Sequence, residues 1–367
     1  MRAGAPDEVL SGAAGWWPVV QSWYGGRLIA ADVPVLRGRV AASTTTDVQQ
    51  RLTMTVPRWD GRDWLPRATD DPLARFGQEL QVSIVVWSAV TGNTWTTRVG
   101  RFLITDTDLD DGASTIEVRG EAVGLRRMRD ARLTGSTVPA EGGTLVSEAR
   151  RLMPAGVSAS IAAGLVDRPV PSMEWTSDRL AAVREIADAW PALLRADEWG
   201  QVALRAPLPA VPSPVLSLRD GMPYRGLPGD PRGTVIGAAR SDTRDGAYNE
   251  VVARSSGTSG DEVVAVARQT TGPMSVTGPY GPVTREWASP LIDSQATAQA
   301  SAETMLTNSL APSRVLPVTH VPDPRIDLDD PVEVIRDGVT DWGWVVGYDL
   351  PLTVRDGAMR TDVGLVA

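Results

Sequence analysis

Apolar and polar residues alternate at every second position through much of the first third of the sequence. The segment 48–56 is typical, because Val48, Leu52, Met54 and Val56 are separated by polar residues. This spacing is that of β-strands, which place successive side chains on opposite faces of a sheet. Short strands separated by Gly-, Pro- and Asp-rich turns favour an antiparallel barrel or sandwich. The predicted strands cover residues 16–23, 27–30, 36–43, 48–56, 79–88, 95–105 and 114–119.

The middle of the chain has a helical pattern instead. Residues 142–152 favour a helix that Thr144 or Ser147 caps. A second helix is expected after Ser177 as N-cap, because apolar residues from Leu180 to Trp190 recur on one face. Residues 193–204 then predict a hairpin that turns near 198–200. These elements indicate a small α/β insert.

The last third returns to strands after a Pro- and Gly-rich segment, a linker or an extended edge, over residues 206–233. An Ala-rich helix is expected at 294–310. The fold class is therefore mainly β with a small α/β insert, divided as 1–130, 131–230 and 231–367. The two β thirds could be related units, but their residues show no repeat. The late strands are expected at residues 234–239, 249–254, 262–268, 315–320, 331–336, 342–348 and 359–366.

Composition excludes several classes of function. The chain has no Cys, so it has no disulfides, zinc ribbons or thiol nucleophiles, and His320 is its one His. A net charge of −9 argues against a protein that neutralises nucleic-acid phosphates. All 36 basic residues are Arg, which indicates a GC-rich genome such as that of an actinobacterium or its phage. We find no signal peptide and no apolar run of membrane length, and we expect no cofactor and no enzymatic activity.

One segment resembles a calcium loop. Asp106, Asp108 and Asp110 alternate before a Gly, and Glu117 follows eleven residues after Asp106. However, Asp111 occupies the sixth position, where the sharp turn of such a loop requires Gly. The segment also lies between two predicted strands and not between helices. We therefore favour a solvated hairpin turn and assign no metal site.

Tryptophan and carboxylate residues leave a carbohydrate-binding or carbohydrate-active β protein as an alternative of another class. The dipeptides Glu174-Trp175, Glu198-Trp199 and Glu286-Trp287 have the composition of sugar sites. Isolated Trp residues in β proteins more often anchor cores and interfaces. The acidic segment 327–331 is interpreted as a turn that leads into the strand 331–336.

The order of these features resembles that of the tail-hub, or baseplate-hub, proteins of long-tailed phages. The resemblance rests on the strand after Phe76-Gly77-Gln78, the strand that begins with Gly100-Arg101-Phe102, and the helix-plus-hairpin insert at 181–202. Residues 248–252 resemble the start of a second barrel, and residues 326–332 resemble one of its later parts. The resemblance covers most of the chain from about residue 27. The length and composition of the chain are also similar to those of minor tail proteins of actinobacterial siphophages.

The resemblance implies two tube-like β domains, of barrel or sandwich type, in each subunit of a homotrimer. Such a ring sits at the distal end of the tail, in the virion, after synthesis in the host cytoplasm. Its partners would be distal tail or tail-tube proteins above, and tail-tip, fibre or tape-measure proteins below. DNA would pass through an acidic lumen without specific binding. A distal tail protein, which forms a hexameric ring, and a contractile-injection-system hub are the alternatives within this class.

Overall fold

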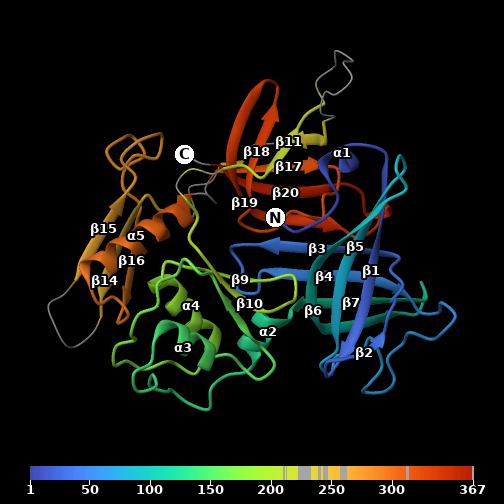
Figure 1. Ribbon diagram of the computed structural model, residues 1–367, viewed down its shortest axis with the longest axis horizontal. Coiled ribbons are helices and arrows are strands. Elements are labelled where there is room, and N and C mark those ends of the chain that lie inside the picture. Colours follow the sequence, from blue (N-terminus) through green and yellow to red (C-terminus); the bar gives the residue numbers. More distant parts are fainter. Residues whose placement is uncertain are drawn as a thin grey trace.

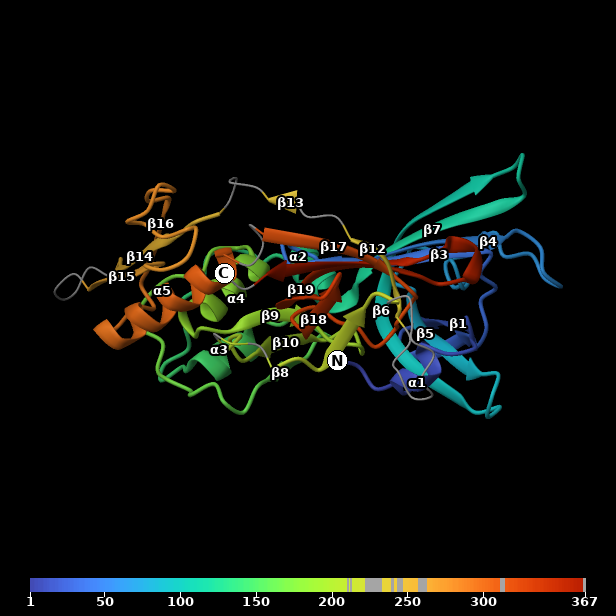
Figure 2. The same cartoon turned by 90° about the horizontal axis from the view of Figure 1, so that it is seen from above.

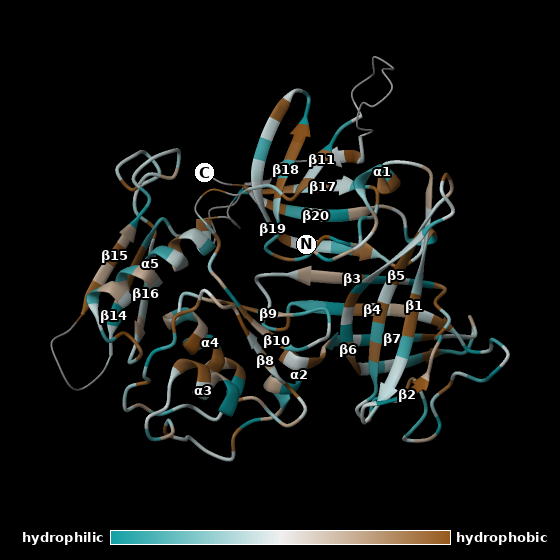
Figure 3. Cartoon of the chain, viewed as in Figure 1, coloured by the Kyte–Doolittle hydropathy of each residue, from teal (hydrophilic) through white to brown (hydrophobic). Residues whose placement is uncertain are grey.

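The computed structural model describes residues 1–209, 211, 213–221, 233–238, 241–242, 247–256, 263–310 and 314–365. Most of its strands join one large sheet, with two small sheets and a few helices beside it (Figure 1). Apolar and polar bands alternate along strands such as β1 and β4, as the period-two pattern predicts (Figure 3). The mainly β class is therefore confirmed.

The first β unit contains seven strands in the order β3-β4-β7-β6-β5-β1-β2. Its core is formed by alternating side chains such as Leu52, Met54 and Val56 on β4. Between Ile104 and Asp106 the register of β6 against β7 shifts by one residue. The strands are β1 (Ala14–Tyr24), β2 (Arg27–Ala30), β3 (Arg37–Ser43), β4 (Gln50–Pro57), β5 (Glu79–Ser88), β6 (Thr94–Asp110) and β7 (Thr115–Ala122).

The α/β insert packs its helices around the buried Trp175. Thr144 caps α3 as the sequence predicts, but the N-cap of α4 is Asp178 and not Ser177, because the Asp178 carboxylate accepts from the Ala181 amide. Leu204 pairs with Ile161 in a parallel strand that sequence reasoning missed. The elements are α2 (Val123–Asp130), α3 (Leu145–Arg151), β8 (Ala159–Ile161), α4 (Arg179–Ala189), β9 (Leu193–Ala196) and β10 (Val202–Arg205).

The second β unit has the order β12-β17-β20-β19-β18-β11, with β13 pairing β17 beyond β12. Its strand β11 falls within the segment 206–233, which the sequence assigned to a linker or an extended edge. Residues 210, 212 and 222–232 of this segment lie outside the described residues. The strands are β11 (Leu216–Arg219), β12 (Val235–Ala238), β13 (Ser241–Asp242), β17 (Arg314–His320), β18 (Pro331–Arg336), β19 (Val339–Pro351) and β20 (Met359–Leu365).

A side body interrupts the second β unit. It consists of a three-stranded sheet of order β15-β14-β16 with α5 packed on it, and it has its own apolar cluster. The expectation that residues 248–252 start a second barrel is not met, because β14 pairs within this small sheet. The elements are β14 (Glu250–Ser255), β15 (Val264–Arg268), β16 (Thr284–Ser289) and α5 (Gln295–Leu310).

The two β units are fused edge to edge. Strand β19 of the second unit pairs antiparallel with β3 of the first, placing Asp349 opposite Ala41 and making one 14-stranded sheet. No closed barrel is found among the described strands. A single bridge between Asp220 and Val235 connects the ends of the second unit's sheet. The structure thus gives a continuous sheet where the sequence predicts two separate tube-like domains.

The two units repeat the same register over five strands. The strands β3, β4, β7, β6 and β5 correspond in order to β12–β13, β17, β20, β19 and β18. The shift after Ile104 in β6 recurs after Val345 in β19. Beyond this shift, Asp108 on β6 faces Glu117 on β7 in the first unit. Asp349 faces Arg360 at the corresponding place in the second.

The same correspondence extends to the edge strands of the two units. Ala41 on β3 faces Arg51 on β4, and Arg51 in turn faces Glu121. In the second unit these positions hold Ser241, Val315 and Gly364, which face one another in the same succession. A common register over five strands makes the two β units structural repeats, although their residues differ.

Candidate functional site

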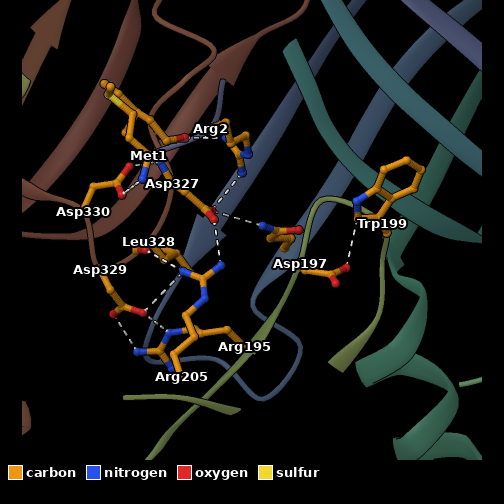
Figure 4. Close-up of polar contacts among 12 residues, drawn as sticks. Met1, Arg2, Arg195, Asp197, Trp199, Arg205, Asp327, Leu328, Asp329 and Asp330 are labelled. Atoms are coloured by element: carbon orange, nitrogen blue, oxygen red, sulfur yellow. Dashed lines mark hydrogen bonds and ion pairs between the residues drawn. The ribbon is translucent and has the colours of Figure 1, made fainter. Parts of the chain in front are cut away.

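A cluster of buried charges joins three parts of the chain (Figure 4). Its centre is Asp327, in the turn before β18. Arg2, from the N-terminal arm (residues 1–10), donates to one carboxylate oxygen at 2.8 Å, and Arg205 on β10 donates to the other at 3.0 Å. Arg2 also donates to the Tyr348 hydroxyl at 2.7 Å. The Asp327 carboxylate therefore binds the arm and the insert to the second β unit.

Asp329 makes a second link within this charged junction. Both of its carboxylate oxygens accept from Arg195 on β9, at 2.6 and 2.8 Å, in a bidentate pair. Its backbone has a φ of 68°, a conformation that Asp adopts more readily than most residues. The amine of Met1 contacts the next carboxylate, Asp330, which also accepts from the Asp327 amide.

The electrostatics of the junction depend on this pairing. Burial alone would raise the pKa of Asp327, but the adjacent Arg2 and Arg205 guanidinium groups outweigh it and hold the pKa below its ordinary value. At Asp330 burial prevails and raises the pKa. Removing one partner of such a buried pair leaves an uncompensated charge, which costs about 3–5 kcal/mol. The arrangement links the N-terminal arm, the insert and the second β unit through ion pairs.

The sequence predicts the turn at 327–331 and the strand after it, and both are confirmed. It does not predict that these carboxylates are buried, since their partners Arg2 and Arg195 lie more than 130 residues away in the chain. Three acidic residues near one another usually indicate exposure to solvent. No local signal distinguishes this buried cluster from an exposed one.

The calcium-loop candidate forms the outer half of the β6–β7 hairpin. Asp106, Asp108 and Asp110 alternate along β6, and Glu117 faces Asp108 across the pair. Arg119 lies between the carboxylates, 3.6 Å from Asp108 and 2.8 Å from Glu117. No group of three or more ligands suited to a metal ion occurs in the described part of the chain. The exposed hairpin that the sequence favours is the arrangement observed.

The acid–aromatic pairs of the sequence do not form one sugar site. Trp175 is fully buried and donates to Glu148 at 2.9 Å, so it belongs to the core of the insert. Trp287 is partly buried between the insert and the side body. Trp199 is 54% exposed and stacks on Arg98 of β6 at 3.3 Å. These three rings have different roles in packing the domains together.

The other exposed tryptophans also lie on separate elements. Trp17 on β1 and Trp87 on β5 share the outer face of one strand pair, because Trp17 faces Val85. Trp59 and Trp342 are exposed on a loop and on β19. A sugar groove would require several rings along one depression. Buried and surface rings in these positions are more typical of core and interface anchors.

A polar cleft of about 400 Å³ lies where the two β units, the insert and the side body meet. Asp188 on α4 lines it together with Arg184 and Arg285. Burial raises the pKa of Asp188 to about 6, with a smaller contribution from Glu185, although both guanidinium groups lower it. The sequence did not single out this carboxyl, whose pKa is strongly shifted.

His320 is buried at the end of β17 and contacts the Thr361 hydroxyl at 2.8 Å and the Val321 carbonyl at 2.7 Å. Burial lowers the pKa of its imidazole. It is a structural residue, as the sequence indicates for a lone His in a strand. Among the described helices, none has the length and hydropathy needed to cross a membrane.

The fold is that of several phage tail proteins. A tail protein from Neisseria meningitidis MC58 superimposes with a TM-score of 0.64 and 15% identity, over 95% of this chain and 96% of that one. The 43 kDa tail protein of prophage MuSo2 from Shewanella oneidensis gives 0.62 and 13%, over 94% and 98%. The prophage tail protein gp18 from Listeria monocytogenes EGD-e gives 0.50 and 9%, over 95% and 94%. No family model and no curated protein matches the sequence.

Proposed function

We propose that this chain is a structural tail-hub (baseplate-hub) protein, which forms a homotrimeric ring at the distal end of a phage tail tube. The observation that carries the proposal is the pair of β units with one common register in a single chain. Three such chains present six similar β units, so a ring of three can meet a six-fold tube on one side and a three-fold tip on the other.

The fold similarity supports the same proposal. Three tail proteins match this chain over nearly their whole length, so the likeness is not confined to one common motif. Identities of 9–15% support the fold and leave the role in the virion as a proposal. We propose three parts divided near residues 130 and 230, with the side body as an addition to the third.

The mechanism of a hub is mechanical. Junctions such as Asp327 with Arg2 and Arg205 hold the parts of one subunit in a fixed arrangement. Neighbours above would be distal tail or tail-tube proteins, and neighbours below would be tail-tip, fibre or tape-measure proteins. A net charge of −9 suits a ring that DNA crosses without binding.

Light scattering of the purified protein over a concentration series tests this proposal. We expect a particle of three chain masses that persists on dilution. Six chain masses would favour the distal tail protein, whose ring is hexameric, and a monomer at every concentration would contradict the hub. A trimer does not separate a siphophage hub from a contractile-system hub. That distinction requires the neighbouring tail proteins, tested by mixing them with the trimer.

A further inference from the structure

We infer that the outer edge of β6 pairs with the β12–β13 edge of the next copy of this chain, with Asp108 opposite Ser241. The inference rests on the proposed ring and specifies its subunit contact. It would extend the large sheet from one chain to the next by backbone hydrogen bonds. The two β units of one chain already meet through a contact of this kind.

The contact inside the chain supplies the geometry. Strand β19 pairs with β18 over its first half and with β3 over its second half, where Asp349 faces Ala41. The repeated register makes Asp108 the counterpart of Asp349, and Ser241 the counterpart of Ala41. Each unit thus carries both halves of the same joint. Inside the chain, the joint forms between β19 of the second unit and β3 of the first unit. The corresponding edges, β6 of the first unit and β12–β13 of the second, take no part in it.

The two remaining halves have open edges. Strand β6 pairs with β5 as far as Leu103, and beyond that point the described residues place β7 on one side of it and no strand on the other. Strands β12 and β13 pair with β17. On their opposite side, the described residues place the bridge from Asp220 to Val235 and the Arg336 side chain, which donates to the Ala238 carbonyl, and no strand beside β13. Backbone groups at such edges are ready to accept a further strand.

Exposure of equivalent side chains supports the same contact. Leu350 is fully buried in the joint between β19 and β3, whereas its counterpart Leu109 on β6 is 37% exposed. The β6–β7 hairpin that carries Leu109 extends away from the rest of the sheet (Figure 2). Asp106, Asp108 and Asp110 surround this leucine with negative charge, which keeps an open edge from pairing indiscriminately.

The symmetry of the joint determines the type of assembly. The β6 edge and the β12–β13 edge are different surfaces, so the contact is heterologous and each copy offers one edge to each neighbour. A head-to-tail contact closes into a ring when the rotation from one copy to the next, repeated over all copies, makes one full turn. The joint between the units of one chain and the joint between chains would then alternate around the ring.

Engineered cysteines test the register directly, because the chain has no Cys of its own. Residues that face each other in an antiparallel pair have Cα atoms about 4.5–5.5 Å apart, which suits a disulfide. The double variant Asp108→Cys with Ser241→Cys should oxidise to a covalent trimer on a non-reducing gel. An equimolar mixture of the two single variants should give covalent dimers, and either single variant alone should give none.

Two controls make the outcome specific. The pair Ala41→Cys with Asp349→Cys occupies the equivalent joint inside one chain, so it should lose both free thiols and stay one chain in size. The pair Asp106→Cys with Ser241→Cys is two residues out of register, about 7–8 Å apart, and should not cross-link. If the internal pair oxidises and light scattering gives a trimer, but Asp108→Cys with Ser241→Cys yields no cross-link, the inference is overturned and the hub remains. A particle that stays monomeric overturns both.

Discussion

The turn before β5 and the turn before β18 occupy equivalent places in the two β units, yet they are built differently. In the first unit Gly77 takes a positive φ, and the neutral Gln78 donates to the carbonyls of a neighbouring loop. In the second, Asp329 takes the positive φ and Arg195 binds its carboxylate. One backbone path is therefore held by neutral groups in one unit and by ion pairs to distant parts of the chain in the other.

The long strands of the two units differ in the same way. The second half of β19 is covered by β3 of the same chain, whereas the described residues place no second neighbouring strand beside the second half of β6. The second unit thus holds the subunit together, through its charges and its filled edge. The first unit keeps its equivalent edge for other contacts. When a chain carries two copies of one β unit, one copy can hold the chain together while the other contacts neighbouring chains.

The largest expected effect is at the charged junction. Asp327→Ala leaves the buried Arg2 and the half-buried Arg205 without their carboxylate, which should lower the free energy of unfolding by about 3–5 kcal/mol. Arg75 is the exposed equivalent in the first unit, and Arg75→Ala should change it by less than about 0.5 kcal/mol. The urea concentrations at the unfolding midpoints of the two variants, each compared with the wild type, measure these changes. Equal shifts would contradict the division of roles between the units.

The second pair of substitutions compares the filled edge with the open one. Leu350→Ala should destabilise the isolated chain by about 2–5 kcal/mol, because it opens a cavity in the joint between the units. Leu109→Ala should change stability by less than about 0.5 kcal/mol in the same conditions. Thermal unfolding under conditions that keep the chain dissociated measures both. A large loss from Leu109→Ala would show that β6 is already covered.

The third prediction concerns pH at the cleft beside the joint. The pKa of Asp188 is about 6 in the folded chain, above its ordinary value of 3.8, so the folded state holds a proton more tightly than the unfolded state. Its stabilising contribution is present below pH 4 and is lost as pH rises through 6, by on the order of 2 kcal/mol.

Asp188→Asn imitates the protonated form. The variant should match the wild type near pH 4 and be more stable near pH 8 by on the order of 2 kcal/mol. Chemical unfolding at both pH values gives the difference. Equal stability at pH 8 would mean that Arg184 and Arg285 fully compensate for burial of the carboxylate. The Asp327 junction shifts the opposite way, since its lowered pKa makes acid destabilising.

The smallest expected effect is at the contact between the insert and the first unit. Trp199→Ala removes the ring that stacks on Arg98 and should destabilise the chain by about 0.5–2 kcal/mol. Trp59→Ala, at a ring that is 69% exposed, serves as the matched control. Differential scanning calorimetry detects this difference. The same small shift in both variants would indicate that Trp199 does not hold the insert in place.

Local patterns predicted most of the fold. Alternation located β1, β4 and β5 within two residues, and the apolar stripe from Leu180 located α4. The strands that were missed, such as β8 and β11, have three or four residues and depend on pairing with distant strands. The side body was missed as a unit because β14 and β15 have the same local pattern as the strands of the large sheet, and its third strand, β16, was not predicted.

The repeat of the β units was beyond the reach of sequence comparison for a physical reason. A common register requires that buried and exposed positions correspond, and it does not require the same residues. Phe102 and Gly343 occupy equivalent places, since Phe102 faces Ala122 and Gly343 faces Leu365. The burial of Asp327 depends on ion pairs with Arg2 and Arg205, which lie far from it in the sequence. No local sequence pattern includes both Asp327 and these partners.

In the proposed hub, two equivalent β units per chain build a ring of three chains. Electron microscopy of the purified particle, averaged without imposed symmetry, tests it most directly. We expect a closed ring of six similar lobes around a central channel, with three side bodies that reduce the symmetry to three-fold. A ring with lobes of two unrelated shapes, or an open chain of subunits, would contradict it.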